Sequence, residues 1–455
     1  MKYSIYFILF SFFGIIIFPN VFSSLAFGLT LTIGLRLFLE SNKSFMFREW
    51  ALFLYALNYL MSPAITYQLN TDLVQYSMKI SSDAYFSLAL PGFLLFTAGM
   101  FIIPNRLFNP EFTKVNKAAV INEQFLLKTT LAGIFMRVLS DFFPGELGFF
   151  IYLMSMTRFV GAFSLFASNT KKFAWLVLLT LLIELFNAFR DGMYHDAIMW
   201  IMFFALFFVY TKKPSNRIKL FGVSSLVFLV LFVQAIKITY REHVWVNGNE
   251  ASLEAIRNIG SSKVNSESLI GEDNLYSTLN RGNQAWIFAS TVDNLDRTKN
   301  FQGLTNVNKY LEAALLPRFL APNKLSSGNK EIFNEFSGHI INEGTSMGLG
   351  IFADGYIAYG AWGVYIFGFA LGLIFALTFK LVERWTKVSP FYVLLLLPLL
   401  NYAVRPDCEL QTTINHLFKG ILLYGFLVYL TRKRFTLDSQ ENKRKLVHHN
   451  LLSSK

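Results

Sequence analysis

The chain has 455 residues, of which 54% are hydrophobic and only 15% are charged. Soluble domains carry about 25% charged residues, so this composition excludes a soluble, a disordered or a fibrous protein and predicts an all-α membrane protein. The formal charge of +12 shows an excess of basic residues, and the single cysteine, Cys408, excludes an intramolecular disulfide. No Cys and His residues have the spacing of zinc ligands, so we predict no metal and no cofactor.

Twelve apolar runs are long enough to cross about 30 Å of hydrocarbon as helices. The first follows Lys2 and is not followed by a small-residue cleavage site, so we interpret it as a retained span. The first two runs, which could form a tight hairpin, and the fifth, which carries Lys128 and Arg137, are the weakest. The predicted spans are residues 3–18, 21–39, 50–66, 85–104, 125–142, 147–168, 173–190, 194–210, 218–239, 356–379, 388–404 and 414–430.

The distribution of lysine and arginine over the loops predicts the orientation of these spans. If the N-terminus is cytoplasmic, the cytoplasmic segments hold 22 Lys and Arg residues, whereas the short outer loops hold 3. We therefore expect both termini in the cytoplasm of a bacterial cell, with the protein in the inner membrane. The basic charge then reflects topology and lipid contact, and we predict no binding of nucleic acid.

Four regions follow from this map. Residues 1–239 carry spans one to nine, and residues 351–430 carry spans ten to twelve. Residues 240–350 form a large outer loop, in which amphipathic helical pieces alternate with Ser-, Asn- and Gly-rich stretches. Residues 431–455 form a basic cytoplasmic tail. We expect function in the large outer loop.

Ionisable residues inside spans are functional candidates, because burying a charge in a bilayer costs at least about 2.5–3.5 kcal/mol. Arg158 has no acidic partner in its own helix, so it pairs across helices or binds an anion. Glu184 and Arg190 are six positions apart and do not share a helix face. Arg190 is thus either an interfacial charge or part of an inward-facing anion site. Arg137 and Asp141, at i and i+4, are interpreted as a structural pair.

Further arginines lie in the outer segments. The planar, permanently charged guanidinium suits phosphate oxygens. Each of these arginines alone is compatible with a solvated surface charge, but together with Arg190 they could bind the pyrophosphate of a lipid-linked donor. These outer arginines are Arg241, Arg281, Arg318 and Arg405.

Two other residues before the tenth span are candidates. His339 is either a general base toward a sugar hydroxyl or a structural hydrogen-bonding residue. Asp354, two residues before Tyr356, is either an acid or an interfacial cap. Glu335 and Glu343 have no assigned role. No DxD sequence occurs, so a metal held as in many soluble sugar-nucleotide transferases is not predicted.

Four stretches, in this order relative to the spans, resemble the Wzy-type polymerases of oligosaccharide repeat units. They are FNAFRDG at the end of a span, NFQGLTNVNKYLEAALLPRFLAPNK in the outer loop, GLGIFADGYIAYGAWGVYIFGFALG at the entrance of a span, and VRPDCELQ before the last one. The stretches cover about a fifth of the chain, whereas the architecture covers all of it.

The resemblance implies a metal-independent glycosyltransferase of the GT-C class at the periplasmic face. Such an enzyme moves the growing chain from undecaprenyl diphosphate onto a new undecaprenyl-diphosphate-linked repeat unit, with a chain-length-determinant co-polymerase as a possible partner. The functional arginines of the family fall on Arg190, Arg241, Arg318 and Arg405. Relatives often have Glu where this chain has Asp354, which puts an acid role there in doubt.

From these residues we assign roles to the candidates. The predicted catalytic residues are Arg190, Arg318 and Arg405, which hold the diphosphate, and His339, the base. The predicted substrate-binding residues are Arg158, Arg241, Arg281, Asp354 and Tyr356.

Three other classes remain as alternatives. An O-antigen ligase shares a multi-span body with a large outer loop. A flippase or other transporter has buried charges but usually short loops. A receptor-like or purely structural membrane protein does not need Arg158 or Glu184 in its spans.

Overall fold

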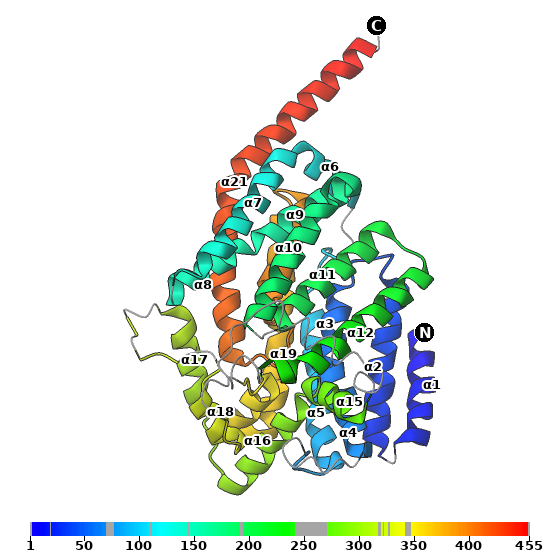
Figure 1. Cartoon of the computed structure of the whole chain (residues 1–455), viewed down its shortest axis with the longest axis vertical. Coiled ribbons are helices and arrows are strands. Elements are labelled where there is room, and N and C mark those ends of the chain that lie inside the picture. The colour runs from blue at the N-terminus through cyan, green and yellow to red at the C-terminus, as the bar shows by residue number, and fades with distance from the viewer. Residues whose placement is uncertain are drawn as a thin grey trace.

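Figure 1 shows the chain as a bundle of helices in a computed structural model. The structure describes residues 2–18, 20–69, 77–108, 112–143, 145–191, 194–241, 271–316, 320–321, 323–325, 328–341 and 347–453. Side chains are described for these residues except at positions 112–113, 191, 236–241, 272–273, 281 and 436–453. Every regular element of this described part is a helix, as the composition predicts.

Among the described residues up to Arg241, the structure has twelve α-helices and one π-helical segment, η1. Their bounds are α1 Lys2–Ile17, α2 Val21–Glu40, α3 Phe47–Ala56, η1 Leu57–Met61, α4 Ser62–Leu69, α5 Ser82–Phe101, α6 Phe112–Ile121, α7 Glu123–Ser140, α8 Gly145–Ser155, α9 Thr157–Ser168, α10 Thr170–Asp191, α11 His195–Lys212 and α12 Asn216–Arg241.

The second half adds short helices, a 3₁₀ segment, η3, and two long helices. Their bounds are α15 Glu272–Arg281, α16 Ala285–Thr298, α17 Thr305–Leu315, α18 Lys330–Ser337, α19 Ile351–Trp385, η3 Pro390–Leu395, α20 Leu396–Leu400 and α21 Leu410–Ser453.

Eight helical segments of the described residues are long and apolar enough to cross a membrane. Each overlaps one of the twelve predicted spans, namely the second, the fourth, the sixth to tenth and the twelfth. The segments are Val21–Glu40, Ser82–Phe101, Gly145–Ser168, Thr170–Arg190, His195–Lys212, Asn216–Ala235, Ile351–Trp385 and Leu410–Phe435. The chain is therefore a multi-pass helical membrane protein.

The other four predicted spans have different local structures. The first forms α1, a helix of only 16 residues. The third is divided among α3, η1 and α4, which follow one another from Phe47 to Leu69. The fifth forms α7, which contains the charged residues Glu123, Lys128 and Arg137. The eleventh is split into η3 and α20. Twelve spans thus stay a proposal.

The predicted tenth span, 356–379, differs from the structure at its start. Helical structure begins at Ile351, but Tyr359 and Gly360 leave the helical conformation, with φ −143° and 58°. The chain reverses there so sharply that a Cβ on Gly363 would lie 1.7 Å from the Gly355 oxygen. Residues 351–358 therefore form a separate short helix against the long one. Sequence periodicity misses this turn because both pieces are apolar.

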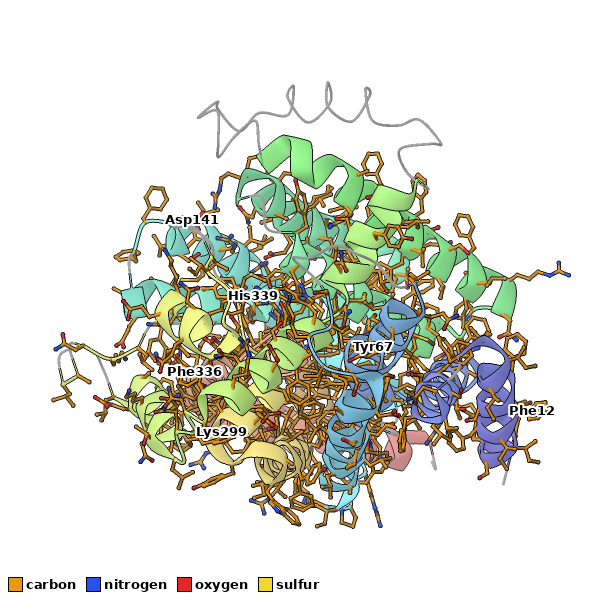
Figure 2. All side chains as sticks on the ribbon, turned by 90° about the horizontal axis from the view of Figure 1, so that it is seen from below. Phe12, Tyr67, Asp141, Lys299, Phe336 and His339 are labelled. Atoms are coloured by element: carbon orange, nitrogen blue, oxygen red, sulfur yellow. The ribbon has the colours of Figure 1, made fainter. Side chains whose placement is uncertain are left out.

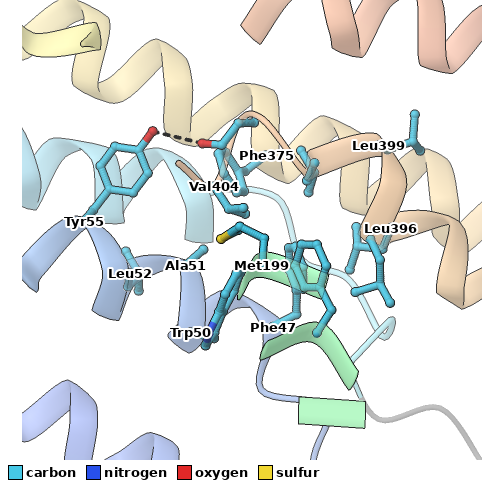
Figure 3. Packing of buried hydrophobic residues seen from close by; sticks show 14 of the residues in the cluster. Phe47, Trp50, Ala51, Leu52, Tyr55, Met199, Phe375, Leu396, Leu399 and Val404 are labelled. Carbon is cyan, nitrogen blue, oxygen red and sulfur yellow. Dashed lines mark hydrogen bonds between the residues drawn. The ribbon is translucent and has the colours of Figure 1, made fainter. Parts of the chain in front are cut away.

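Aromatic packing holds the centre of the bundle together. Phe47 and Trp50 on α3 pack against Phe203 on α11, with ring centroids 6.0 and 5.1 Å apart. Tyr55 lies among the same buried residues and donates a hydrogen bond of 2.9 Å to the Ala403 carbonyl, which Figure 3 shows. Van der Waals packing of this kind drives association of helices in a membrane, where burial from water adds little.

The two ends of the molecule are formed by different parts of the chain. The C-terminal half of α21 projects from one end, whereas α16 and α18 lie at the other, as Figure 1 shows. We call the latter the α16–α18 end. There, α17 packs along α21, and the Glu409 carboxylate accepts a hydrogen bond of 2.7 Å from the Gly328 N–H. The start of α21 is thus joined to the segment 271–341.

Candidate functional site

A close approach of α7 and α9 brings charged residues together. Gly133 on α7 allows this approach, because a Cβ there would lie 2.7 Å from the Arg158 backbone nitrogen. On the other side of the contact, a Cβ on Gly161 would lie 2.8 Å from the Leu126 oxygen. Helices with small residues at the contact pack backbone to backbone. The side chains of α7 and α9 therefore meet those of the neighbouring α10.

Arg158 and Glu184 form a buried ion pair between α9 and α10. Arg158 is fully buried and the Glu184 side chain is 6% exposed. Arg158 also donates to the Ser155 carbonyl at 2.7 Å and to its hydroxyl at 2.8 Å. Arg137 Nε lies 3.9 Å from the same Glu184 carboxylate. Of the two alternatives for Arg158, the structure shows pairing across helices.

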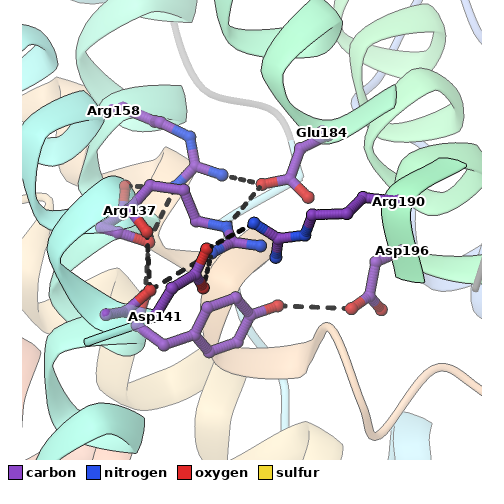
Figure 4. Close-up of polar contacts among 9 residues, drawn as sticks. Arg137, Asp141, Arg158, Glu184, Arg190 and Asp196 are labelled. Atoms are coloured by element: carbon purple, nitrogen blue, oxygen red, sulfur yellow. Dashed lines mark hydrogen bonds and ion pairs between the residues drawn. The ribbon is translucent and has the colours of Figure 1, made fainter. Parts of the chain in front are cut away.

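Asp141 extends the network outward from this pair. Its two carboxylate oxygens accept hydrogen bonds from Arg137 at 2.7 Å and from Arg190 at 2.8 Å. The predicted i, i+4 pair of Arg137 and Asp141 is confirmed, and Arg190 has a partner other than Glu184, as expected. Figure 4 shows the three arginines arranged around the two carboxylates.

Arg405 forms a second group beside the first. Its guanidinium donates to Asp196 at 2.8 Å and lies 3.7 Å from Asp407. The Tyr152 hydroxyl donates to Asp196 at 3.4 Å, and the Arg137 guanidinium lies 5.8 Å from the centre of the Tyr152 ring. Tyr152 thus connects the two groups. We call the whole set the arginine network. It comprises Arg137, Asp141, Tyr152, Arg158, Glu184, Arg190, Asp196, Arg405 and Asp407.

The charge of the loop residues in this network is well defined. Burial raises the pKa of Asp407, but the charges of nearby His195 and Arg405 lower it by more than burial raises it. The pKa of Asp407 therefore lies below its ordinary value. Asp407 is therefore ionised at neutral pH and, like Asp196, forms an ion pair with Arg405.

The inner and outer parts of the arginine network differ in access to solvent. The inner pair, Arg158 and Glu184, is buried, whereas the side chains of Arg190 and Asp141 are 41% and 37% exposed. Arg405 is 13% exposed and its partner Asp196 is 33% exposed. Solvent therefore reaches Arg190 and the carboxylates of Asp141 and Asp196, whereas Arg405 is mostly buried and the inner pair is enclosed between helices.

Exposed apolar residues closely follow Asp141, an outer residue of the network, in the chain. Phe142 and Phe143 follow Asp141 in the chain and are 75% and 38% exposed, and Leu147 on α8 is 57% exposed. An anionic group at Arg190 would thus have apolar surface next to it. This combination suits an amphiphile with an anionic head and a hydrocarbon tail.

Three predicted arginines cannot be placed in this arrangement. Arg318 lies outside the described residues. Arg241 and Arg281 are the last residues of α12 and α15, and their side chains lie outside the described part of the structure.

His339 packs on α16, one of the helices of the α16–α18 end. Its Nε2 lies 3.0 Å from the Ser290 hydroxyl, and its ring lies 5.4 Å from that of Trp286. Burial, together with the charge of Lys79, lowers the pKa of His339 below its ordinary value. Figure 2, which views this end of the molecule, shows His339 near the centre of the face and Asp141 toward its edge. These contacts are those of a structural hydrogen-bonding residue. The role of His339 as a general base stays a prediction.

Asp354 and Tyr356 lie on the short helix that precedes the turn at Gly360. The Asp354 carboxylate is buried and accepts hydrogen bonds from the Leu410 N–H at 2.8 Å and the Tyr310 hydroxyl at 3.2 Å. Leu410 is the first residue of α21, so Asp354 caps the N-terminus of this helix. A carboxylate there interacts with the positive end of the helix dipole. Tyr356 donates to Asp296 at 2.7 Å. Of the two alternatives for Asp354, the contacts favour the cap.

Replacing Asp354 with alanine is expected to destabilise the fold. The change leaves the Leu410 N–H without its acceptor, and a buried donor without a partner costs about 1–3 kcal/mol. Thermal unfolding of the purified protein in detergent measures this loss. Asp354→Asn, which keeps an acceptor oxygen, should lose less. A normally stable Asp354→Ala protein that makes no product would instead support a catalytic acid.

Several residues of the site were not predicted from the sequence. Tyr152 and Tyr310 carry no local signal, because tyrosine is common in apolar helices. Asp407 follows Arg405 by two positions, and this spacing could have indicated a pair. Lys324, whose amino group contacts Glu146 at the start of α8, was also missed.

Possible metal ligands are a separate question. Over the part of the chain that the structure describes, no three His, Cys, Asp or Glu side chains gather as a possible metal site. The absence of a metal from the reaction remains a prediction.

The spans and the arginine network define a multi-pass helical membrane protein with a charged site at the ends of its helices. The chain belongs to the family described as "Domain of unknown function (DUF8712)", whose sequence profile matches residues 45–387, more than half of the chain. No curated protein and no solved structure matches the chain significantly.

Proposed function

We propose that this protein is a glycosyltransferase that polymerises oligosaccharide repeat units carried on undecaprenyl diphosphate. The observation that carries the proposal is the arginine network with apolar side chains directly beside it. Arg190 and Arg405 offer guanidinium groups to a diphosphate, and Phe142 and Leu147 offer apolar surface to a prenyl chain. The resemblance of four stretches to Wzy-type polymerases supports the same function.

The reaction requires charge neutralisation of the leaving group. The acceptor hydroxyl oxygen bonds to the anomeric carbon of the growing chain, and the bond from this carbon to the diphosphate oxygen breaks. The electron pair leaves with the diphosphate, and the hydroxyl proton passes to a base. Fixed guanidinium groups stabilise the charge that develops on the diphosphate. We assign this role to Arg190, Arg405 and Arg318.

The other candidate residues take different roles. Arg241 and Arg281 are proposed to position donor or acceptor. Arg158 is buried against Glu184, so we now assign it to the support of the site rather than to substrate binding. Tyr356 is proposed to contact sugar.

The proposal includes a topology of twelve spans and a GT-C architecture in the bacterial inner membrane, with both termini in the cytoplasm. The unequal distribution of basic residues supports it. The position of the basic tail and of α16–α18 at opposite ends of the molecule also supports it. The proposal also includes a chain-length-determinant co-polymerase as a partner. Only the family resemblance supports this partner.

A gel of surface polysaccharide from a deletion strain tests the proposal. We expect loss of the high-molecular-weight ladder, retention of single repeat units, and rescue by the wild-type gene. Loss of even the single repeat would favour an O-antigen ligase or a flippase. An unchanged ladder would contradict the proposal.

The proposed base role of His339 predicts a pH dependence. A general base acts in its neutral form, and the pKa of His339 lies below its ordinary value. Polymerisation in proteoliposomes should therefore be full at neutral pH and fall as the pH drops through this lowered pKa. His339→Gln should lower the rate about 10²–10⁴-fold and remove the acid limb. An unchanged rate and profile would assign His339 a structural role only.

A further inference from the structure

Helix α17 has apolar residues on two different sides. On one face, Tyr310, Ala313 and Ala314 are buried against the protein. On the other, Leu311 and Leu315 are separated by one turn and are 37% and 48% exposed. Leu304, the residue just before the helix, lies seven positions before Leu311 on the same side and is 51% exposed, with the exposed Asn308 between them. We call these three residues the leucine stripe.

The side of α17 between its buried face and the leucine stripe is polar. Thr305, Lys309 and Glu312 are all exposed there. The leucine stripe, in contrast, exposes apolar surface on one side of the helix, interrupted by the exposed Asn308. Clustered exposed apolar residues mark contact with a protein or a membrane. The leucine stripe therefore indicates that α17 has an apolar neighbour.

The position of α17 indicates which neighbour this is. The helix packs along α21, whose membrane-crossing segment begins at Leu410. Tyr310 on α17 and Leu410 both bind the Asp354 carboxylate, so they lie at the same level. The buried face of α17 thus contacts a membrane helix, and the leucine stripe points away from it.

The leucine stripe also continues into a surface that belongs to membrane helices. The Lys324 amino group contacts Glu146 at the start of α8 and donates to the Leu316 carbonyl at the end of α17 at 2.5 Å. Leu316 is 39% exposed, and Leu147 on α8 is 57% exposed. The stripe and the lipid-facing side of α8 are therefore joined through one lysine.

We propose that α17 is immersed in the membrane leaflet at the α16–α18 end, where the leucine stripe contacts lipid hydrocarbon. The large segment 240–350 is then not an entirely aqueous loop, because α17 forms part of the lipid-facing wall. Lys309 and Glu312 lie to the side and remain at the polar interface. This inference requires only that α21 and α8 cross the membrane and does not depend on the proposed enzymatic activity.

Spin labels on single cysteines test this placement. Cys408 is the only cysteine and is buried, so a Cys408→Ser background accepts one new cysteine at a time. We would compare Leu311→Cys and Leu315→Cys with Lys309→Cys and Glu312→Cys in proteoliposomes. Phe228→Cys on α12, where the side chain is 57% exposed, is the lipid control. Arg297→Cys on α16 is the aqueous control.

We expect labels on the leucine stripe to be several-fold more accessible to oxygen, which partitions into lipid, than to a water-soluble nickel chelate. The two polar positions should show the reverse. Preferential access of the chelate to the stripe would overturn the proposal. Protection from both reagents would also overturn it, because a protein neighbour such as a second copy would then cover the stripe. If a variant fails to elute as folded protein, Leu304→Cys replaces it on the same stripe.

Discussion

Replacing Arg190 with alanine is expected to abolish the high-molecular-weight ladder while single repeat units persist. Arg190 is 41% exposed and is held at 2.8 Å by an Asp141 carboxylate that solvent can also reach. A diphosphate can exchange with this carboxylate, and the guanidinium then stabilises the charge of the leaving group. Loss of one such group lowers a rate by about 10²–10³-fold. Polymer formation from purified lipid-linked repeat units in proteoliposomes measures the change.

The chain offers a matched control for Arg190. Arg297 on α16 is also exposed and also paired with a carboxylate, that of Asp293 at 2.7 Å, but it lies outside the arginine network. Arg297→Ala should therefore leave polymerisation unchanged. Arg190→Lys keeps the charge but loses the planar fork, and we expect an intermediate rate. A full ladder with Arg190→Ala, at normal amounts of protein in the membrane, would remove Arg190 from the mechanism.

The fold could be predicted where it depends on composition and helix length. Long apolar runs must be helical in a membrane, since every backbone polar group needs an internal partner there. The turn at Gly360 was not predictable in the same way. It depends on the contact of Gly355 with Gly363, and glycines are common in membrane helices without such a turn. Local apolar character thus identifies helices but not the places where they reverse.

The site could be predicted in part, because some of its pairs are local. Arg137 and Asp141 are one turn apart in one helix, so the sequence alone indicates their contact. The sequence also shows that Arg158 needs a partner, since burying it alone is costly. It does not identify Glu184 as that partner, because the choice depends on how α9 and α10 pack. The same holds for Arg405 and Asp196, which are far apart in the chain.

Replacing Glu184 with leucine is expected to cause the largest loss of stability. The change leaves the fully buried Arg158 without its carboxylate, and Arg137 loses the same neighbour. Removing one partner of a buried ion pair lowers the free energy of unfolding by about 3–5 kcal/mol. The loss is measured by unfolding the purified protein in detergent, either by heating it or by adding denaturant.

A second substitution separates the lost ion pair from lost packing. In the double variant Arg158→Leu with Glu184→Leu, both charges are absent, so no uncompensated charge remains in the bundle. This variant should be more stable than Glu184→Leu alone, because apolar replacement of a whole buried pair is often nearly neutral. Asp293→Asn, which breaks an exposed pair on α16, should change stability by less than about 1 kcal/mol. Equal stability of Glu184→Leu and the wild type would show that the pair does not support the bundle. Glu184 would then be a candidate for proton transfer, since nothing structural would explain its burial.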